Sequence, residues 1–204
     1  MTSNTGPHDP SYYTHTIHYI EVMCKAAFED IGSHGWEHVE RVRTLCKIIG
    51  KKEGADLLVL DLAALFHDVM RTSEDHALQS AEFARSVLST MGFGDDICAA
   101  VYEAIASHSY SSGRSPKSLE AKVLSDADKL DAMGATGIYR TIQYNTERAL
   151  PPARILEHIK KKLLNLPQTL QTDSAKEIAK KRIPIMEHYL RCLEEELLET
   201  SISK

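Results

Sequence analysis

The sequence lacks long apolar runs and a strong excess of charge of either sign. No run approaches the roughly 20 apolar residues that a membrane-spanning helix needs, and the first ten residues are polar, without the apolar stretch of a signal peptide. The formal net charge of −5 over 204 residues does not indicate a strongly basic surface for nucleic acid. We expect a soluble, cytoplasmic protein whose partner is a small molecule, not a nucleic acid polymer or a membrane.

The sequence also has few cysteines, and none of them form a CxxC pair. Widely separated single cysteines do not build a disulfide framework or a zinc knuckle, so we interpret each as a small apolar residue in a reducing compartment. The cysteines are Cys24, Cys46, Cys98 and Cys192.

The alternation typical of β-strands is missing as well, and there are no internal repeats. Apolar residues instead recur at three- and four-residue steps, with Gly, Pro and Ser clusters between the periodic segments. The predicted fold class is therefore all-α, a compact bundle. We expect helices over residues 11–30, 33–50, 55–70, 76–91, 95–108, 118–133, 153–166 and 174–199, and either helix or turn over 136–145.

This length is sufficient for one domain with a sizeable core. We expect residues 1–10 to form a disordered arm and residues 11–200 to form a single helical domain. Within it, a core over about residues 33–135 would be followed by additional helices over about 136–200. The long last helix could pack against a second copy, so a homodimer is the assembly we consider.

The most informative stretch, Leu65-Phe66-His67-Asp68-Val69, closes an apolar run that only Asp61 interrupts. Burying an imidazole or a carboxylate alone costs several kcal/mol, about 2–7 for a neutral polar group and more for a charge. A bound metal ion that is coordinated by both groups would offset this cost.

Two further motifs carry suitable side chains. His34 and His38 are four positions apart, on one face of a predicted helix. Asp126, Asp128 and Asp131 lie in a segment with a broad apolar face, which indicates that their helix packs deeply. Each motif alone is weak, because single helix histidines are commonly structural and acidic clusters are commonly solvated.

The order His, His-Asp, Asp, each on its own helix, makes the pattern specific. It resembles the HD-domain superfamily of metal-dependent phosphohydrolases, whose fold is all-α. The chain is similar to a subgroup of small, stand-alone, bacterial-type HD proteins that includes nucleotide pyrophosphohydrolases, and the likeness covers about residues 15–200. It rests on five blocks in order, at residues 34–42, 64–68, 105–109, 119–134 and 162–172.

The resemblance implies that His38, His67, Asp68 and Asp128 bind a metal ion. Two imidazoles and two carboxylates suit a divalent ion such as Mn²⁺, Mg²⁺, Fe²⁺, Co²⁺ or Zn²⁺, and the family favours Mn²⁺. Such an ion polarises a phosphoryl oxygen and lowers the pKa of a bound water.

The resemblance also implies catalytic and substrate-binding residues. Besides Asp68, we expect His76 and His108 to lie near the cleft as catalytic residues, supporting the site or the substrate more than binding a second metal. Cationic side chains would stabilise the charge of a phosphoryl group. The predicted substrate-binding residues are His34, Arg41, Lys129, Asp131, Arg140, Lys162 and Arg182.

The predicted reaction is hydrolysis of a nucleoside triphosphate to the monophosphate and pyrophosphate. A nucleoside 5′-monophosphate phosphohydrolase, a di-iron oxygenase of the HD type and a non-catalytic nucleotide-binding module are the alternatives. The segment between Arg140 and Lys162 is short compared with relatives, so substrate contacts from this region cannot be carried over from them.

Overall fold

The structure, a computed structural model, describes residues 10–28, 35–109 and 113–202, and in this part of the chain it contains helices and no strand. The predicted all-α class is confirmed. No helix among the described residues is long and apolar enough to cross a membrane. The helices are α1 (Pro10–Ala27), α2 (Trp36–Glu53), α3 (Leu57–Phe66), α4 (His76–Thr90), α5 (Asp95–His108), α6 (Leu119–Asp131), α7 (Gly134–Glu147), α8 (Ala153–Lys161), the 3₁₀ helix η2 (Leu163–Thr169) and α9 (Asp173–Ile202).

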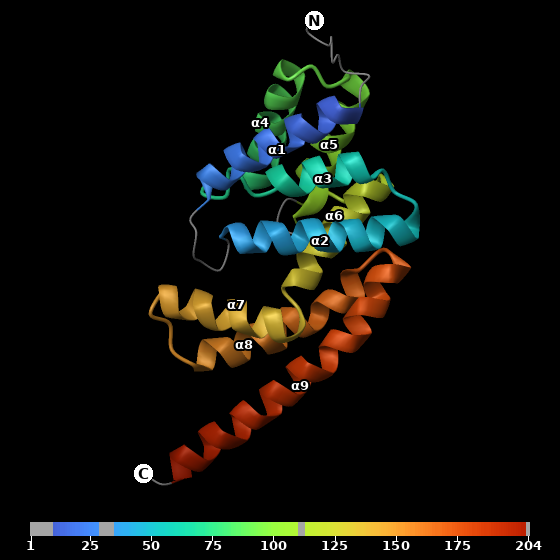
Figure 1. Cartoon of the computed structure of the whole chain (residues 1–204). Helices are drawn as coiled ribbons and strands as arrows, with labels where there is room; N and C mark the ends of the chain where they lie inside the picture. The colour runs from blue at the N-terminus through green and yellow to red at the C-terminus, as the bar shows by residue number, and fades with distance from the viewer. Residues whose placement is uncertain (1–9, 29–34, 110–112, 203–204) are drawn as a thin grey trace, which may run out of the picture.

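The helices form two groups (Figure 1). In the first group α3 packs against α1, α2, α5 and α6, and α4 packs along α5. In the second group α7 and α8 pack against each other and against α9, which also contacts α6. The last turns of α9 extend beyond α7 and α8 (Figure 1). The helix α6 therefore connects the two groups.

The central position of α3 follows from its sequence. From Val59 to Phe66 almost every side chain is buried, as the apolar character on all sides predicts. Asp56 caps its first turn, because its carboxylate accepts hydrogen bonds from two backbone amides there. The helix expected over residues 55–70 instead ends at Phe66. His67 and Asp68, which were expected inside this helix, therefore lie in the turns that follow it. The backbone bond from the Val69 amide to the Phe66 carbonyl closes the first of these turns.

Other predicted boundaries also shift. The helix expected over 153–166 divides into α8 and the 3₁₀ helix η2, which contains Pro167. Proline lacks a backbone N–H and disfavours the α conformation of the preceding residue, which explains the change of helix type. The first helix begins at Pro10, inside the expected arm, while residues 1–9 and 29–34 lie outside the described part of the chain.

A buried carboxylate fixes the second group of helices to the first. Asp126 of α6 is fully buried and accepts hydrogen bonds from the backbone amides of Gln171 and Thr172 and from the Thr172 hydroxyl, at 2.7–3.1 Å. The Thr172 Oγ1 in turn accepts a bond from the Ala175 amide, in the first turn of α9. One side chain of α6 therefore determines where α9 begins.

We predict that Asp126→Ala lowers the free energy of unfolding by about 3 kcal/mol, because it leaves buried donors without an ionised acceptor. Urea unfolding followed by circular dichroism measures this change. Asp173→Ala is the control, because Asp173 lies next to the same junction but its side chain is 93% exposed and pairs with the exposed Lys176. Equal unfolding midpoints for the two variants would contradict the proposed role of Asp126.

Candidate metal centre

Four side chains from three segments converge between α2, α3 and α6. His38 comes from α2, His67 and Asp68 from the turns after α3, and Asp128 from α6. The Nε2 atom of His38 lies 3.1 Å from Nε2 of His67, 3.5 Å from Asp128 Oδ1 and 3.8 Å from Asp68 Oδ2. Donor atoms of His38, His67 and Asp128 all lie within 4.8 Å of one another. The structure therefore brings together the four side chains that the sequence suggested as metal ligands.

Two more histidines lie beside Asp68. Nε2 of His76, at the start of α4, is 3.6 Å from Asp68 Oδ1, and Nε2 of His108, at the end of α5, is 3.8 Å from the same oxygen. His67, Asp68 and His108 form a second group of donors within 4.8 Å. The structure thus places His76 and His108 at the edge of the four-residue cluster.

Backbone carbonyls hold two of the imidazole rings. Nδ1 of His67 lies 2.8 Å from the Ala64 carbonyl oxygen, and Nδ1 of His108 lies 2.6 Å from that of Ile105. Because a carbonyl oxygen only accepts, the Nδ1 atom must carry the proton in both rings. The lone pair of a neutral ring is then on Nε2, which faces the cluster, as in many metal-binding histidines.

The third ring, that of His38, is held by a carboxylate. Its Nδ1 lies 2.8 Å from Asp131 Oδ2. Asp131 is buried and also accepts hydrogen bonds from Arg41 Nε at 2.7 Å and from Arg140 Nη1 at 2.9 Å. Burial alone would raise the pKa of Asp131, but the bonds from His38 and Arg41 hold it well below its usual range. Arg41 and Asp131, which we predicted to bind substrate, thus contact each other and orient His38.

The electrostatics of the cluster suit a cation. Burial lowers the pKa of His67 to about 4, so this ring is neutral at pH 7. Although burial opposes it, the neighbouring histidines lower the pKa of Asp68 and of Asp128, so both carboxylates are ionised. Neutral imidazole and ionised carboxylate are the forms that bind metals. The donor set therefore fits a divalent ion, while its chemistry leaves the choice of metal open.

Sequence reasoning missed Arg71. Its Nη1 donates to both carboxylate oxygens of Asp68, at 3.0 and 3.2 Å, and lies 3.4 Å from Nε2 of His76. The available signal was its position three residues after Asp68, between the helices expected over residues 55–70 and 76–91. Arg71 places a permanent positive charge beside the cluster.

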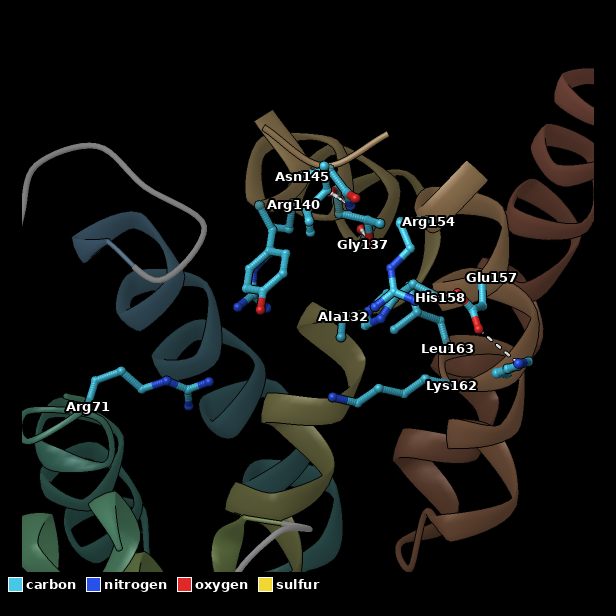
Figure 2. Close-up of a pocket in the computed structure, with 14 residues that line it drawn as sticks. Arg71, Ala132, Gly137, Arg140, Asn145, Arg154, Glu157, His158, Lys162 and Leu163 are labelled. Carbon is cyan, nitrogen blue, oxygen red and sulfur yellow. Dashed lines mark hydrogen bonds and ion pairs between the residues drawn. The ribbon is translucent and has the colours of Figure 1, made fainter. Parts of the chain in front are cut away.

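Arg71 also lines a cavity of about 570 Å³, whose other lining residues come mainly from α7 and α8 (Figure 2). This volume lies in the usual range of small-molecule sites, about 300–1,000 Å³. Among the described residues that line it, Glu157 is the one carboxylate. The positively charged residues that line the cavity are Arg71, Arg140, Arg154, Lys161 and Lys162. The cavity is therefore suited to an anionic ligand.

Two predicted substrate-binding cations lie elsewhere. The Lys129 ammonium is buried and donates to Ser125 Oγ at 2.7 Å, and that hydroxyl donates to the His108 carbonyl at 2.7 Å. The guanidinium of Arg182 donates to the Leu130 carbonyl at the end of α6. Neither residue is among those that line the cavity, whereas Arg140 and Lys162 are. These contacts indicate that Lys129 and Arg182 support the helices that carry the centre. His34, which was also predicted to bind substrate, lies outside the described residues.

Comparisons with known proteins identify relatives over most of the chain. The HD domain family matches residues 35–133. The protein YpgQ of Bacillus subtilis (strain 168) is 32% identical over 178 residues, which cover 83% of this chain and 87% of YpgQ. The crystal structure of YpgQ in complex with ADP superposes with a TM-score of 0.75, covering 88% of this chain and 97% of that one, at 32% identity. A predicted HD superfamily hydrolase from an uncultured Thermotogales bacterium gives a TM-score of 0.68 at 32% identity, covering 88% and 92%.

We predict that Asp131→Asn weakens metal binding about 10- to 100-fold, because an amide in place of the carboxylate makes His38 a poorer donor and leaves two guanidinium groups unbalanced. Titration of the metal-free protein with Mn²⁺ in a calorimeter measures the affinity. Asp61→Asn is the matched control, because Asp61 also pairs with an arginine, Arg43, but within the described residues it has no hydrogen bond to the centre. Equal affinities of both variants and the parent would show that Asp131 does not tune the centre.

Proposed function

The chain belongs to the HD-domain superfamily of metal-dependent phosphohydrolases, and from this we propose that it hydrolyses nucleotides, converting a nucleoside triphosphate to the monophosphate and pyrophosphate. The observation that carries the proposal is the convergence of anchored imidazoles and ionised carboxylates beside a cavity with a cationic lining. A metal centre without such a cavity would not favour a phosphorylated substrate.

In this proposal His38, His67, Asp68 and Asp128 hold the metal ion. When bound, the ion would act as a Lewis acid and provide a nucleophilic water at neutral pH. The side chain of Asp128 is 32% exposed, whereas that of His38 is 1% exposed, so the centre is most accessible on the Asp128 side. The substrate phosphate would approach from there.

Cations of the cavity wall would bind the phosphates. Arg71 lies beside Asp68, and Arg140 lies behind His38 through Asp131, so both reach from the centre to the cavity. Lys162 extends towards the interior of the cavity (Figure 2). Fixed positive charges stabilise the negative charge that spreads over a transferring phosphoryl group.

The two histidines beside Asp68 are suited to opposite roles in proton transfer, one as acceptor and the other as donor. Burial lowers the pKa of His76, which keeps this half-buried ring neutral and able to accept a proton. Burial alone would also lower the pKa of His108, but the negative charge of Asp68, 3.8 Å from its Nε2, raises it, which favours a protonated ring that can donate. Neighbouring groups whose pKa values are shifted apart are a common basis of acid–base catalysis.

A nucleotide is the substrate class that this chain's relative supports. The crystal structure of B. subtilis YpgQ contains ADP. The cavity of this chain, at about 570 Å³, lies within the usual range of small-molecule sites, about 300–1,000 Å³. It therefore has room for a nucleotide. Hydrolysis of a nucleoside 5′-monophosphate would use the same residues, so product identity distinguishes the two reactions.

One observation favours a second candidate, a di-iron oxygenase. His67, Asp68 and His108 form a further donor group, which shares His67 and Asp68 with the four proposed ligands and could hold a second ion. Metal analysis and oxygen consumption separate the candidates. One ion per chain and no uptake of O₂ would exclude the oxygenase.

We predict that the protein loaded with Mn²⁺ releases pyrophosphate from nucleoside triphosphates, and that His67→Ala and Asp68→Ala abolish this release because each removes a ligand. A panel of nucleotides with separate assays for pyrophosphate, phosphate and nucleoside measures the products. His188→Ala serves as control, since His188 is an exposed histidine of α9. If no nucleotide were hydrolysed with any of the divalent ions tested, or if both ligand variants stayed fully active, the proposed function would be wrong.

A further inference from the structure

The last turn of α5 holds a histidine ring beside the candidate centre. The helix ends at His108, and the backbone of Ser109 is already extended. The last four carbonyls of a helix have no amide partner within it, and in α5 these include the carbonyls of Ile105 and His108. The Ile105 carbonyl accepts a hydrogen bond from Nδ1 of the His108 ring at 2.6 Å. The ring is therefore fixed relative to α5, and its place depends on what holds the end of this helix.

A serine of α6 binds the end of α5. The Ser125 hydroxyl donates to the His108 carbonyl at 2.7 Å, and Ser125 is 2% exposed. Asp128, a predicted metal ligand, follows Ser125 on α6 by about one helical turn. One helix thus positions a ligand side chain directly and the backbone of His108 through a hydrogen bond.

Lys129 determines which way the Ser125 hydroxyl points. Its Nζ lies 2.7 Å from Ser125 Oγ, which is about one turn earlier on α6. An ammonium only donates, so the serine oxygen accepts this bond. The single proton of the hydroxyl is then directed to the His108 carbonyl, which only accepts. The three groups form a chain of hydrogen bonds with one possible direction, from Lys129 through Ser125 to His108.

The His108 ring lies among groups whose spacing matters for the proposed chemistry. Its Nε2 is 3.8 Å from Asp68 Oδ1. Its centroid lies 5.3 Å from that of the His67 ring and 5.8 Å from that of the His76 ring. A displacement of about 1 Å in an active site can lower a rate by about 10²-fold. The hydrogen bond of Ser125 therefore bears on the centre, although Ser125 is not among the residues that line the cavity.

We propose that Ser125 and Lys129 are positioning residues, which hold the end of α5 so that the His108 ring keeps its place beside Asp68. The part of this inference that concerns catalysis, the role of His108 as a proton donor, rests on the proposed function. Neither Ser125 nor Lys129 contacts the substrate in this proposal. Their loss should therefore lower the rate of the chemical step and leave substrate binding largely unchanged.

Kinetics of two variants test the effect on the rate. Ser125→Ala removes the bond to the His108 carbonyl, and Lys129→Met removes the ammonium but keeps a long unbranched side chain. Both are measured with Mn²⁺ and the nucleoside triphosphate that the parent hydrolyses fastest. We expect kcat to fall about 10-fold in Ser125→Ala and about threefold in Lys129→Met, with KM within about twofold of the parent.

Ser107→Ala is the matched control. Ser107 is also a buried serine, in the last turn of α5, but its hydroxyl donates to the Glu103 carbonyl of its own helix at 2.7 Å. This variant should have the kcat and KM of the parent. Should Ser125→Ala fail to fold, as judged by circular dichroism, Ser125→Cys takes its place, because a thiol is similar in shape but a weaker donor.

A double-mutant cycle tests whether Ser125 acts through His108. His108→Gln removes the ring, so adding Ser125→Ala to it should lower kcat by less than about twofold, whereas independent effects would multiply. A further loss of about 10-fold in the double variant would overturn the proposal. So would an unchanged kcat in Ser125→Ala, a KM that rises as much as kcat falls, or full activity of His108→Gln.

Spectra of the histidine rings test the position without any substrate. Protein with isotope-labelled histidine is measured by NMR with Mg²⁺, and His108→Gln identifies the His108 signals by their loss. We expect these signals to move or broaden in Ser125→Ala and Lys129→Met but not in Ser107→Ala, with the exposed His188 as internal reference. Unchanged His108 signals in Ser125→Ala would overturn the positioning role, whatever the protein hydrolyses. Changed signals in a protein that hydrolyses no nucleotide would support the positioning and refute only the proposed reaction.

Discussion

The candidate centre depends on the hydrogen bonds that fix the far side of each imidazole ring. Carbonyls of Ala64 and Ile105 hold Nδ1 of His67 and His108, and the carboxylate of Asp131 holds Nδ1 of His38. The two carbonyls lie three residues before their histidines, so the helix ends of α3 and α5 themselves set these ring orientations. For His38 the partner comes from another helix, which requires α2 and α6 to pack in one register. Three Nε2 atoms then face a common region before any ligand binds, so little reorganisation is needed on binding.

Three aspartates of α6 have three different roles. Asp126 accepts bonds from the start of α9, Asp128 faces the cluster, and Asp131 orients His38. Successive positions of a helix are rotated by about 100°, so carboxylates two and three residues apart leave the axis in different directions. The helices that form the cavity and the helices that form the centre are thus joined through one rigid element. A change in the packing of α9 would therefore reach the metal ligands through α6.

The features of the fold that follow from local sequence patterns could be predicted from the sequence. The contacts that depend on where a side chain points could not. The periodicity of apolar residues predicted the all-α class and the buried α3, and the resemblance to the HD family brought His38, His67, Asp68 and Asp128 together. Nothing local distinguishes Arg41, whose guanidinium bonds to Asp131, from a cation that faces a ligand. The same holds for Lys129, which turns towards Ser125.

Charge balance links the cavity to the centre. Asp131 accepts hydrogen bonds from the guanidinium groups of Arg41 and Arg140, and Asp68 accepts from Arg71, while Asp128 lies beside His38. These six charges cancel, so a divalent ion in the cluster leaves a positive charge that the nearest side chains do not compensate. Placing such a charge in a largely buried site is unfavourable unless an anion accompanies it. A phosphorylated ligand in the cavity would supply that anion, and Arg71 would contact it directly because it lines the cavity and bonds to Asp68. Ion and substrate should therefore strengthen each other's binding, as thermodynamic linkage requires of any such pair.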